Sequence, residues 1–140
     1  MTPQEFARIY ALAFPESRPW ASNEFEALLK SKHCFWVGDS RGFALGRAVA
    51  GESELLTIAV IPEFQQQGHG RRLLGLYHEK ASNIGCESFF LEVAQDNTPA
   101  IGLYKSTGYK ISSQRPGYYT RFDGTSVDAL LMTRAADFDA

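Results

Sequence analysis

The amino-acid sequence predicts an α+β fold arranged around one mixed β-sheet. Apolar residues follow helical spacing near the N-terminus, and short apolar runs typical of an antiparallel hairpin come next. The second half alternates strand, helix, strand and helix before it ends in two further strands. The chain has 140 residues, with 14 Lys and Arg against 16 Asp and Glu, a size and balance that predict a single domain over residues 1–140.

Two helices are predicted at the start of the chain. Apolar residues from Phe6 to Ala13 recur three and four positions apart, which predicts a helix from Pro3 to near Phe14. A second helix is expected with Ser22 as its N-cap, because acidic residues follow in its first turn, where the helix dipole favours them.

The middle of the chain changes to a strand pattern. The runs Cys34–Val37 and Gly42–Ala50 predict a hairpin. Glu54–Ile61 is almost continuously apolar, as expected of a central strand covered on both faces. Helical spacing then returns from Gly70 to Gly85, so this part of the chain predicts strand, glycine-containing loop and long helix.

The last third of the chain completes the sheet. Ser88–Val93 predicts another buried strand, and Thr98–Thr107 predicts a short helix. Two final strands are expected at Tyr109–Ser113 and Val127–Thr133.

Composition argues against several classes of protein. Cys34 and Cys86 form no CxxC pair and are too few for a disulfide scaffold, so both are expected to be buried free thiols. His33, His69 and His78 lack metal-binding spacing, so no metal is expected. A pI near 5.9 argues against general nucleic-acid binding. No apolar run approaches the ~20 residues of a membrane span, so we expect no membrane partner and a cytoplasmic location.

The segment from Gln65 to Arg72 contains the strongest chemical signal. Gly68 and Gly70 allow a tight turn, and the free N–H groups of the following helix point outward at the positive end of its dipole. Arg71 and Arg72 add positive charge in the same turn. The segment therefore predicts an anion site, although a plain glycine-rich turn gives the same pattern; the Walker A and dinucleotide fingerprints are both absent.

Three further residues suggest a site, although each has a structural alternative. Glu92 lies in an apolar strand, where an ionised carboxylate is costly unless it has a partner or faces a cleft; it can also simply point outward. The structural alternative for Asn97 is that it simply caps a helix, and for Tyr104 that it is simply an aromatic residue of the core.

The order and spacing of these motifs resemble the GNAT superfamily of acetyl-CoA-dependent N-acetyltransferases. The matching positions are Gln65-x-x-Gly68-x-Gly70, Leu-Glu92-Val and Asn97-x-x-Ala100-x-x-Leu103-Tyr104-x-x-x-Gly108-Tyr109. A longer set is similar to the RimI-type branch, the bacterial ribosomal protein alanine N-acetyltransferases. That set adds Pro19-Trp20, Arg115-x-x-Tyr118-Tyr119 and Asp128-Ala-Leu-Leu-Met132.

The resemblance implies a GNAT-type fold, a mostly antiparallel sheet with a splay between two parallel strands and helices around it. It implies acetyl-CoA as co-substrate and no metal. The strand backbone would pair with the pantetheine arm, the loop N–H groups would hold the pyrophosphate, and one Asn would lie near the thioester. The implied cofactor-binding residues are Ile58, Ala59, Val60, Gln66, Gln67, Gly68, His69, Gly70, Arg71 and Asn97. Gln65, Gln66 and Gln67 stand where Arg is frequent in the family, which we expect to weaken cofactor affinity at most.

The resemblance also assigns catalytic and acceptor residues. Glu92 matches the general base and Tyr104 the general acid, while a backbone N–H near Val60 would meet the oxyanion. Trp20, Tyr118 and Tyr119 would bind the acceptor, the two tyrosines from a loop.

The implied acceptor is the N-terminal α-amine of a protein, an Ala-starting small-subunit ribosomal protein above all. Other protein N-termini, lysine and small amines stay open as acceptors, because function depends on the site rather than the fold. A non-catalytic acetyl-CoA-binding module is a further alternative. For Tyr118 and Tyr119, the alternative is that they are surface aromatics of a β-turn.

Overall fold

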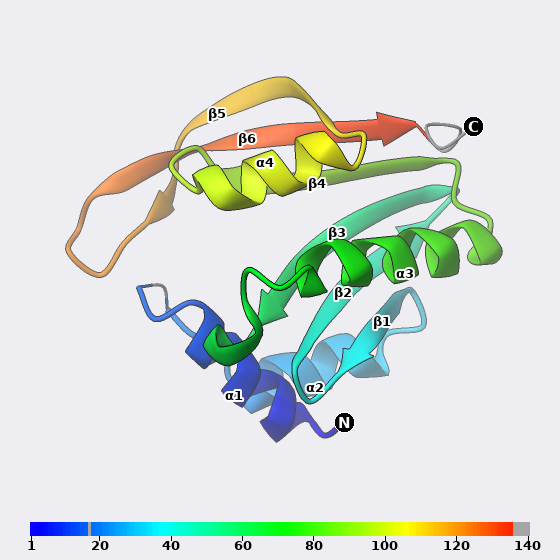
Figure 1. The fold of residues 1–140 in the computed structure, drawn as a ribbon, viewed down its shortest axis with the longest axis horizontal. Coiled ribbons are helices and arrows are strands. Elements are labelled where there is room, and N and C mark those ends of the chain that lie inside the picture. The colour runs from blue at the N-terminus through cyan, green and yellow to red at the C-terminus, as the bar shows by residue number, and fades with distance from the viewer. Residues whose placement is uncertain (17, 136–140) are drawn as a thin grey trace.

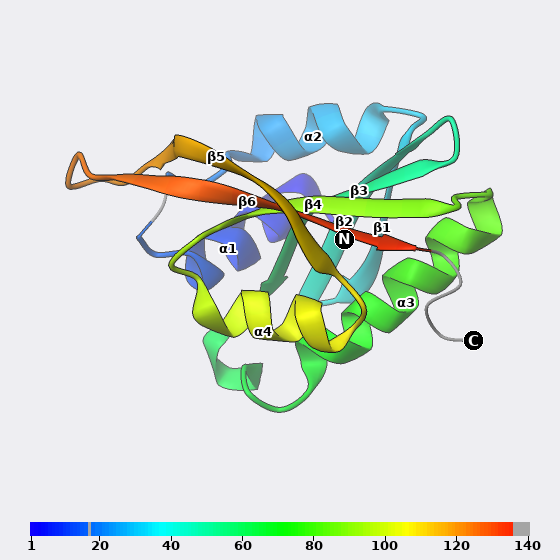
Figure 2. The same ribbon diagram turned by 90° about the horizontal axis from the view of Figure 1, so that it is seen from above.

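The computed structural model describes residues 1–16 and 18–135 and confirms the predicted mixed α+β fold. Six strands form one sheet in the order β1-β2-β3-β4-β6-β5, in which the β3–β4 pair is parallel and the other pairs are antiparallel. Helices cover both faces of this sheet (Figures 1 and 2). The strands are β1 (Cys34–Asp39), β2 (Gly42–Val49), β3 (Glu52–Val60), β4 (Ser88–Ala94), β5 (Lys110–Thr120) and β6 (Ser126–Ala135). The helices are α1 (Pro3–Ala13), α2 (Ser22–Lys30), the 3-10 turn η1 (Pro62–Phe64), α3 (His69–Ile84) and α4 (Thr98–Ser106).

Helices α1 and α2 cover one face of the sheet, α1 against β3 and α2 against β1. Their core is aromatic: Phe6 of α1 contacts Phe25 of α2 and Phe43 of β2, with ring centroids 5.6 and 4.7 Å apart. Such pairs add to the free energy gained by burying the rings. The predicted N-cap of α2 is wrong by one residue. Ala21 is the N-cap, and its backbone N–H donates to Glu24 Oε1 at 3.3 Å, so the acidic residue of the first turn replaces a hydroxyl cap.

Helices α3 and α4 cover the opposite face. The buried side of α3 packs onto the sheet through Leu74 and Tyr77, and Tyr104 of α4 joins the same core cluster as Leu91 and Met132. Gly85 ends α3 in a left-handed conformation with φ of 110°, as its position in the sequence predicts. No helix of the described part of the chain is long and apolar enough to cross a membrane.

Strands β3 and β4 separate halfway along their length. Their parallel pairing runs from Glu52↔Ser88 to Leu55↔Leu91 and stops there. Beyond this point β3 continues to Val60 against β2, and β4 continues to Ala94 against β6. The sheet therefore opens between its two central strands, as the resemblance implied, and Figure 1 shows the two strands diverging.

The structure corrects the expected end of the chain. Strand β5 runs to Thr120 rather than ending at Ser113, so Tyr118 and Tyr119 lie in an edge strand and not in a loop. The pairing of β5 with β6 is irregular between Arg115 and Tyr119, where the sequence contains Pro and Gly. These residues suggest a turn, but an edge strand accommodates them in a bulge.

Candidate active site

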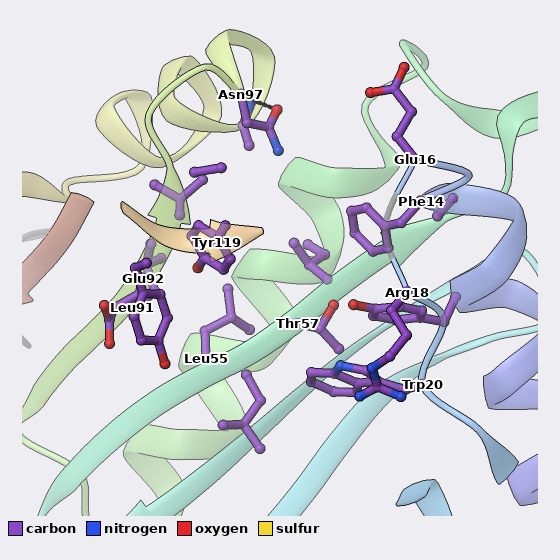
Figure 3. Close-up of a pocket in the computed structure, with 18 of the residues that line it drawn as sticks. Phe14, Glu16, Arg18, Trp20, Leu55, Thr57, Leu91, Glu92, Asn97 and Tyr119 are labelled. Atoms are coloured by element: carbon purple, nitrogen blue, oxygen red, sulfur yellow. Dashed lines mark hydrogen bonds between the residues drawn. The ribbon is translucent and has the colours of Figure 1, made fainter. Parts of the chain in front are cut away.

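A cleft of about 780 Å³ lies where β3 and β4 separate. Figure 3 shows Phe14, Arg18 and Trp20 on one side of it and Glu92 and Tyr119 on the other. The cleft brings together seven of the residues predicted to act in binding or catalysis. They are Trp20, Ile58, Glu92, Asn97, Tyr104, Tyr118 and Tyr119.

Glu92 reaches the cleft from the middle of β4. Its neighbours Leu91 and Val93 are buried under α3 and α4, so strand alternation turns Glu92 to the opposite face of the sheet. Its side chain is 21% exposed, and Oε1 lies 3.2 Å from Nη2 of Arg115. The guanidinium of Arg115 in turn lies 4.3 Å from the ring centre of Tyr118. A half-buried carboxylate with a cationic partner therefore stands at the edge of the opening.

Tyr104 approaches the same cleft from α4, on the other face of the sheet. It is only 6% exposed and belongs to the core under α3 and α4, although it also lines the cleft. Burial raises the pKa of its hydroxyl well above the ordinary value, with a smaller contribution from Tyr119. Tyr104 is therefore protonated at neutral pH and has a proton to donate.

The free edge of β3 presents backbone groups to the opening. Ile61 donates its N–H to the carbonyl of Arg41 at 3.0 Å, on the β1–β2 side of the strand. Because backbone groups alternate along a strand, those of Val60 and Ile58 point to the other side, into the gap. The side chain of Gln65 confirms this direction, since its Nε2 donates to the carbonyl of Val60 at 2.8 Å.

Ala59 has a different place from its two neighbours. By the same alternation its backbone groups face β2, where it pairs with Phe43, and its side chain is 1% exposed. The structure therefore brings the edge groups of Ile58 and Val60 to the gap and leaves Ala59 in the core.

The glycine loop before α3 has the geometry of an anion site. Gln66 and Gly68 have φ of 60° and 84°, and these two left-handed residues let the loop turn tightly into the start of α3. Gly68 is the N-cap of α3 and supplies no side-chain cap, so the N–H groups of the first turn are left for a ligand. Gln67 is tied to the preceding turn, because its Nε2 donates to the carbonyl of Glu63 at 2.9 Å.

Three other predicted cofactor residues have structural contacts. His69 packs edge-on against Phe64, and Arg71 Nη2 donates to Ser106 Oγ of α4 at 2.7 Å. Asn97 is the N-cap of α4, and its Oδ1 accepts the N–H of Ala100 at 3.3 Å. The capping alternative for Asn97 is thus confirmed, while its amide nitrogen carries further donors at the cleft.

Aromatic side chains line the cleft on both sides (Figure 3). Trp20 stacks on Tyr10 with ring centroids 4.9 Å apart and an interplanar angle of 14°. Tyr118 is 49% exposed, whereas Tyr119 is half-buried, and burial raises the pKa of its hydroxyl to about 12. The two tyrosine rings meet edge to face at 5.1 Å.

Sequence reasoning missed the ion pairs that arginine residues of β5 and the β5–β6 hairpin form beside the cleft. Arg115 was identified only as part of a motif, yet it contacts Glu92. Arg121 binds Asp96 through two hydrogen bonds of 2.9 and 2.7 Å, which tie the β5–β6 hairpin to the turn before α4. The sequence signal for Arg115 was its spacing from Tyr118 and Tyr119 along the chain. No sequence pattern predicts the contact between Arg121 and Asp96.

No group of three His, Cys, Asp or Glu side chains that could hold a metal occurs in the described part of the chain. Of the two free cysteines, Cys86 is buried as predicted, and Cys34 is only half-buried.

Comparison with known proteins agrees with this geometry. The sequence profile of the acetyltransferase (GNAT) family matches residues 3–109. The [ribosomal protein bS18]-alanine N-acetyltransferase of Escherichia coli K12 is 37% identical over 123 residues, covering 87% of this chain and 82% of that protein. The N-alpha-acetyltransferase RimI of Mycobacterium tuberculosis is 35% identical over 140 residues, covering 94% and 85%.

A solved structure shows the same arrangement. The crystal structure of the ribosomal-protein-S18-alanine N-acetyltransferase from Escherichia coli superposes with a TM-score of 0.85 at 29% identity, covering 96% of this chain and 87% of that one. The resemblance to the RimI-type branch is therefore confirmed across most of the sequence. The chain belongs to the GNAT family and is an acetyl-CoA-dependent N-acetyltransferase.

Proposed function

We propose that this enzyme transfers the acetyl group of acetyl-CoA to the N-terminal α-amine of a protein, above all an Ala-starting small-subunit ribosomal protein. One observation carries the proposal: Glu92 and Tyr104 reach a single cleft from opposite faces of the sheet, at the point where β3 and β4 separate. The similarity to enzymes named for alanine N-acetylation of bS18 supports this choice of acceptor.

The residues at the opening fit acetyl-CoA. The edge groups of Ile58 and Val60 offer an extended partner the hydrogen bonds that β4 no longer takes. The loop from Gln66 to Gly70 offers N–H groups to a pyrophosphate at the start of α3. Binding there requires the side chain of Gln65 to release or share the carbonyl of Val60. When bound, acetyl-CoA supplies an acetyl group activated as a thioester.

Glu92 would remove the proton that the acceptor amine must lose. An α-amine with a pKa of about 7.7–8.0 is partly protonated at neutral pH, and only the neutral form attacks a carbonyl carbon. Glu92 faces the acceptor side of the cleft and takes the proton directly or through water. The N–H of Val60 or Ile58 would donate to the carbonyl oxygen as negative charge develops on it.

Tyr104 would donate a proton to the departing sulfur. Its hydroxyl is protonated at neutral pH, and a thiolate that forms within reach of it would accept this proton. Proton removal on one face of the sheet and proton donation on the other match a direct transfer from thioester to amine.

The aromatic side chains of the cleft would bind the first residues of the acceptor. Trp20 is fixed by stacking on Tyr10, and Tyr119 is half-buried beside Glu92. Rigid aromatic side chains of this kind bind a flexible peptide at a low cost in conformational entropy.

A panel of peptides tests the proposal. Peptides with the N-terminal sequence of ribosomal protein bS18, differing only in residue 1, would be incubated with acetyl-CoA and read by intact mass. We expect acetylation of peptides that start with Ala, and none of the same peptide with a blocked N-terminus. Acetylation that persists on the blocked peptide would move the acceptor to lysine; acetylation of free small amines alone would replace the proposed function.

A further inference from the structure

Strand β5 contains a wide bulge beside the active site. Arg115 pairs with Ala129 and Tyr119 pairs with Val127, so three residues of β5 lie opposite Asp128 alone. Bulges of this kind bend a strand and turn its side chains in a new direction.

Asp128 holds this bulge with both oxygens of its carboxylate. Oδ1 accepts the backbone N–H of Gly117 at 2.8 Å, and Oδ2 accepts Nε2 of Gln114 at 2.6 Å. These two donors lower the pKa of Asp128, the backbone donor more strongly. Gly117 has φ of 58°, in the left-handed region, and the chain therefore turns at the residue whose N–H donates to Asp128.

The bulge changes the face to which Tyr118 belongs. Arg115 and Tyr119 lie on the same face of the sheet as Glu92. Their partners on β6, Ala129 and Val127, alternate with Leu131, the partner of Glu92, and so share its side of the strand. Strict alternation would turn Tyr118 away from Tyr119. Instead, its ring lies under the guanidinium of Arg115 and lines the cleft with Tyr119.

Asp128 itself stays outside the cleft. Its neighbours on the same side of β6 are Leu130 and Met132, which are buried on the α4 face, and its partner Gln114 pairs with Leu130. A carboxylate on one face of the sheet therefore bonds to a bulge whose flanking side chains lie on the other face.

We propose that Asp128 is a positioning residue for the acceptor: by closing the bulge it holds Tyr118 and Arg115 in the cleft beside Glu92. This inference rests on the proposed function of the cleft. It adds a residue that touches neither the acceptor nor the reacting atoms.

Three variants of the full chain test it. Asp128→Ala removes both acceptors. Asp128→Asn keeps one oxygen for Gly117, and the amide of Gln114 can turn to present its oxygen to the new NH₂ group. Asp123→Ala is the matched control, because Asp123 accepts the N–H and hydroxyl of Thr125 in the same hairpin, at 3.0 and 2.7 Å, but does not line the cleft.

We expect Asp128→Ala to raise the KM for the acceptor about tenfold, with kcat and the KM for acetyl-CoA within about twofold of wild type. Asp128→Asn and Asp123→Ala should stay close to wild type. Amide hydrogen exchange at Gly117, read by NMR, should speed up in Asp128→Ala and not in Asp123→Ala.

Three outcomes would each overturn the proposal: an unchanged acceptor KM in Asp128→Ala, an equal rise of this KM in Asp123→Ala, or unchanged amide exchange at Gly117 in Asp128→Ala. If wild type acetylates an amine other than a protein N-terminus and Asp128→Ala still raises the KM for it, the proposed function fails while the positioning role of Asp128 stands.

Discussion

The two sides of the cleft are built in different ways. On the side of β3 and α3, the groups that face the gap are backbone groups: the free edge of Ile58 and Val60 and the N–H groups of the glycine loop. On the side where we expect the acceptor, β5 and the segment after α1 face each other across the opening with aromatic and charged side chains, held by ion pairs and a bulge (Figure 3).

This difference determines which amino-acid substitutions each side of the cleft tolerates. Backbone groups depend on main-chain conformation, so binding on the β3 side constrains the sequence mainly at the residues with positive φ. Side-chain walls change with every substitution, which suits the recognition of a particular acceptor. Substitutions on one side should therefore change the KM of one substrate and leave the other unchanged.

The largest effect is expected from Glu92→Gln in β4, at the proposed base. The amide keeps the shape of the carboxylate but accepts no proton, so we expect kcat to fall about 10²-fold or more. Steady-state rates with acetyl-CoA and an Ala-starting peptide measure this. A rate near that of wild type would show that another group, or solvent alone, takes the proton.

Tyr104→Phe should lower kcat by about 10²-fold as well, because the departing sulfur loses its proton donor. Phenylalanine keeps the buried ring of Tyr104, so the substitution leaves the packing of the core almost unchanged. Thermal unfolding of the variant controls for stability. If its Tm matches wild type and its rate does too, the acid has been assigned wrongly.

Tyr119→Ala tests the side-chain wall. We expect the KM for the peptide to rise about tenfold, which corresponds to about 1.4 kcal/mol, with the KM for acetyl-CoA unchanged. Tyr119→Phe keeps the ring and serves as the control. Equal changes in both KM values would contradict the separation of the two sides, and no change would favour a purely structural tyrosine.

Gly68→Ala tests the backbone side and should have the smallest effect. Space is available for a Cβ, so the cost is the left-handed φ of 84° alone, about 1–2 kcal/mol of unfolding free energy. The KM for acetyl-CoA should rise a few-fold, and the peptide KM should not. Gly75→Ala, within α3 and also with free space, should instead stabilise the fold by about 0.5–1 kcal/mol. Chemical denaturation should show a lower free energy of unfolding for Gly68→Ala and a higher one for Gly75→Ala. A lower value for both variants would contradict these expectations.

The same difference explains which parts of the structure could be predicted from the sequence. The glycine loop, Pro62 and the spacing of α3 are local signals, so the strand, loop and helix of the cofactor side were predicted almost to the residue. The N-cap of α2 was missed because Ala21 has no capping side chain, and Glu24 does this work from the first turn.

The acceptor side depends on contacts between distant residues. The length of β5 was underestimated because Pro116 and Gly117 suggest a turn, whereas β6 and Asp128 hold them in a bulge. The contact of Arg115 with Glu92 depends on the register across β6, which no local pattern contains. The chemical roles of Glu92 and Tyr104 stay predictions.

We infer that this cleft acetylates a protein N-terminus with Glu92 as the base. The most direct test maps the acetylated atom by fragment mass spectrometry on an Ala-starting peptide that also contains internal lysines, using wild type and Glu92→Gln. We expect acetyl only on the α-amine, formed about 10²-fold more slowly by Glu92→Gln. Acetyl on a lysine side chain, or equal rates for the two proteins, would contradict this inference.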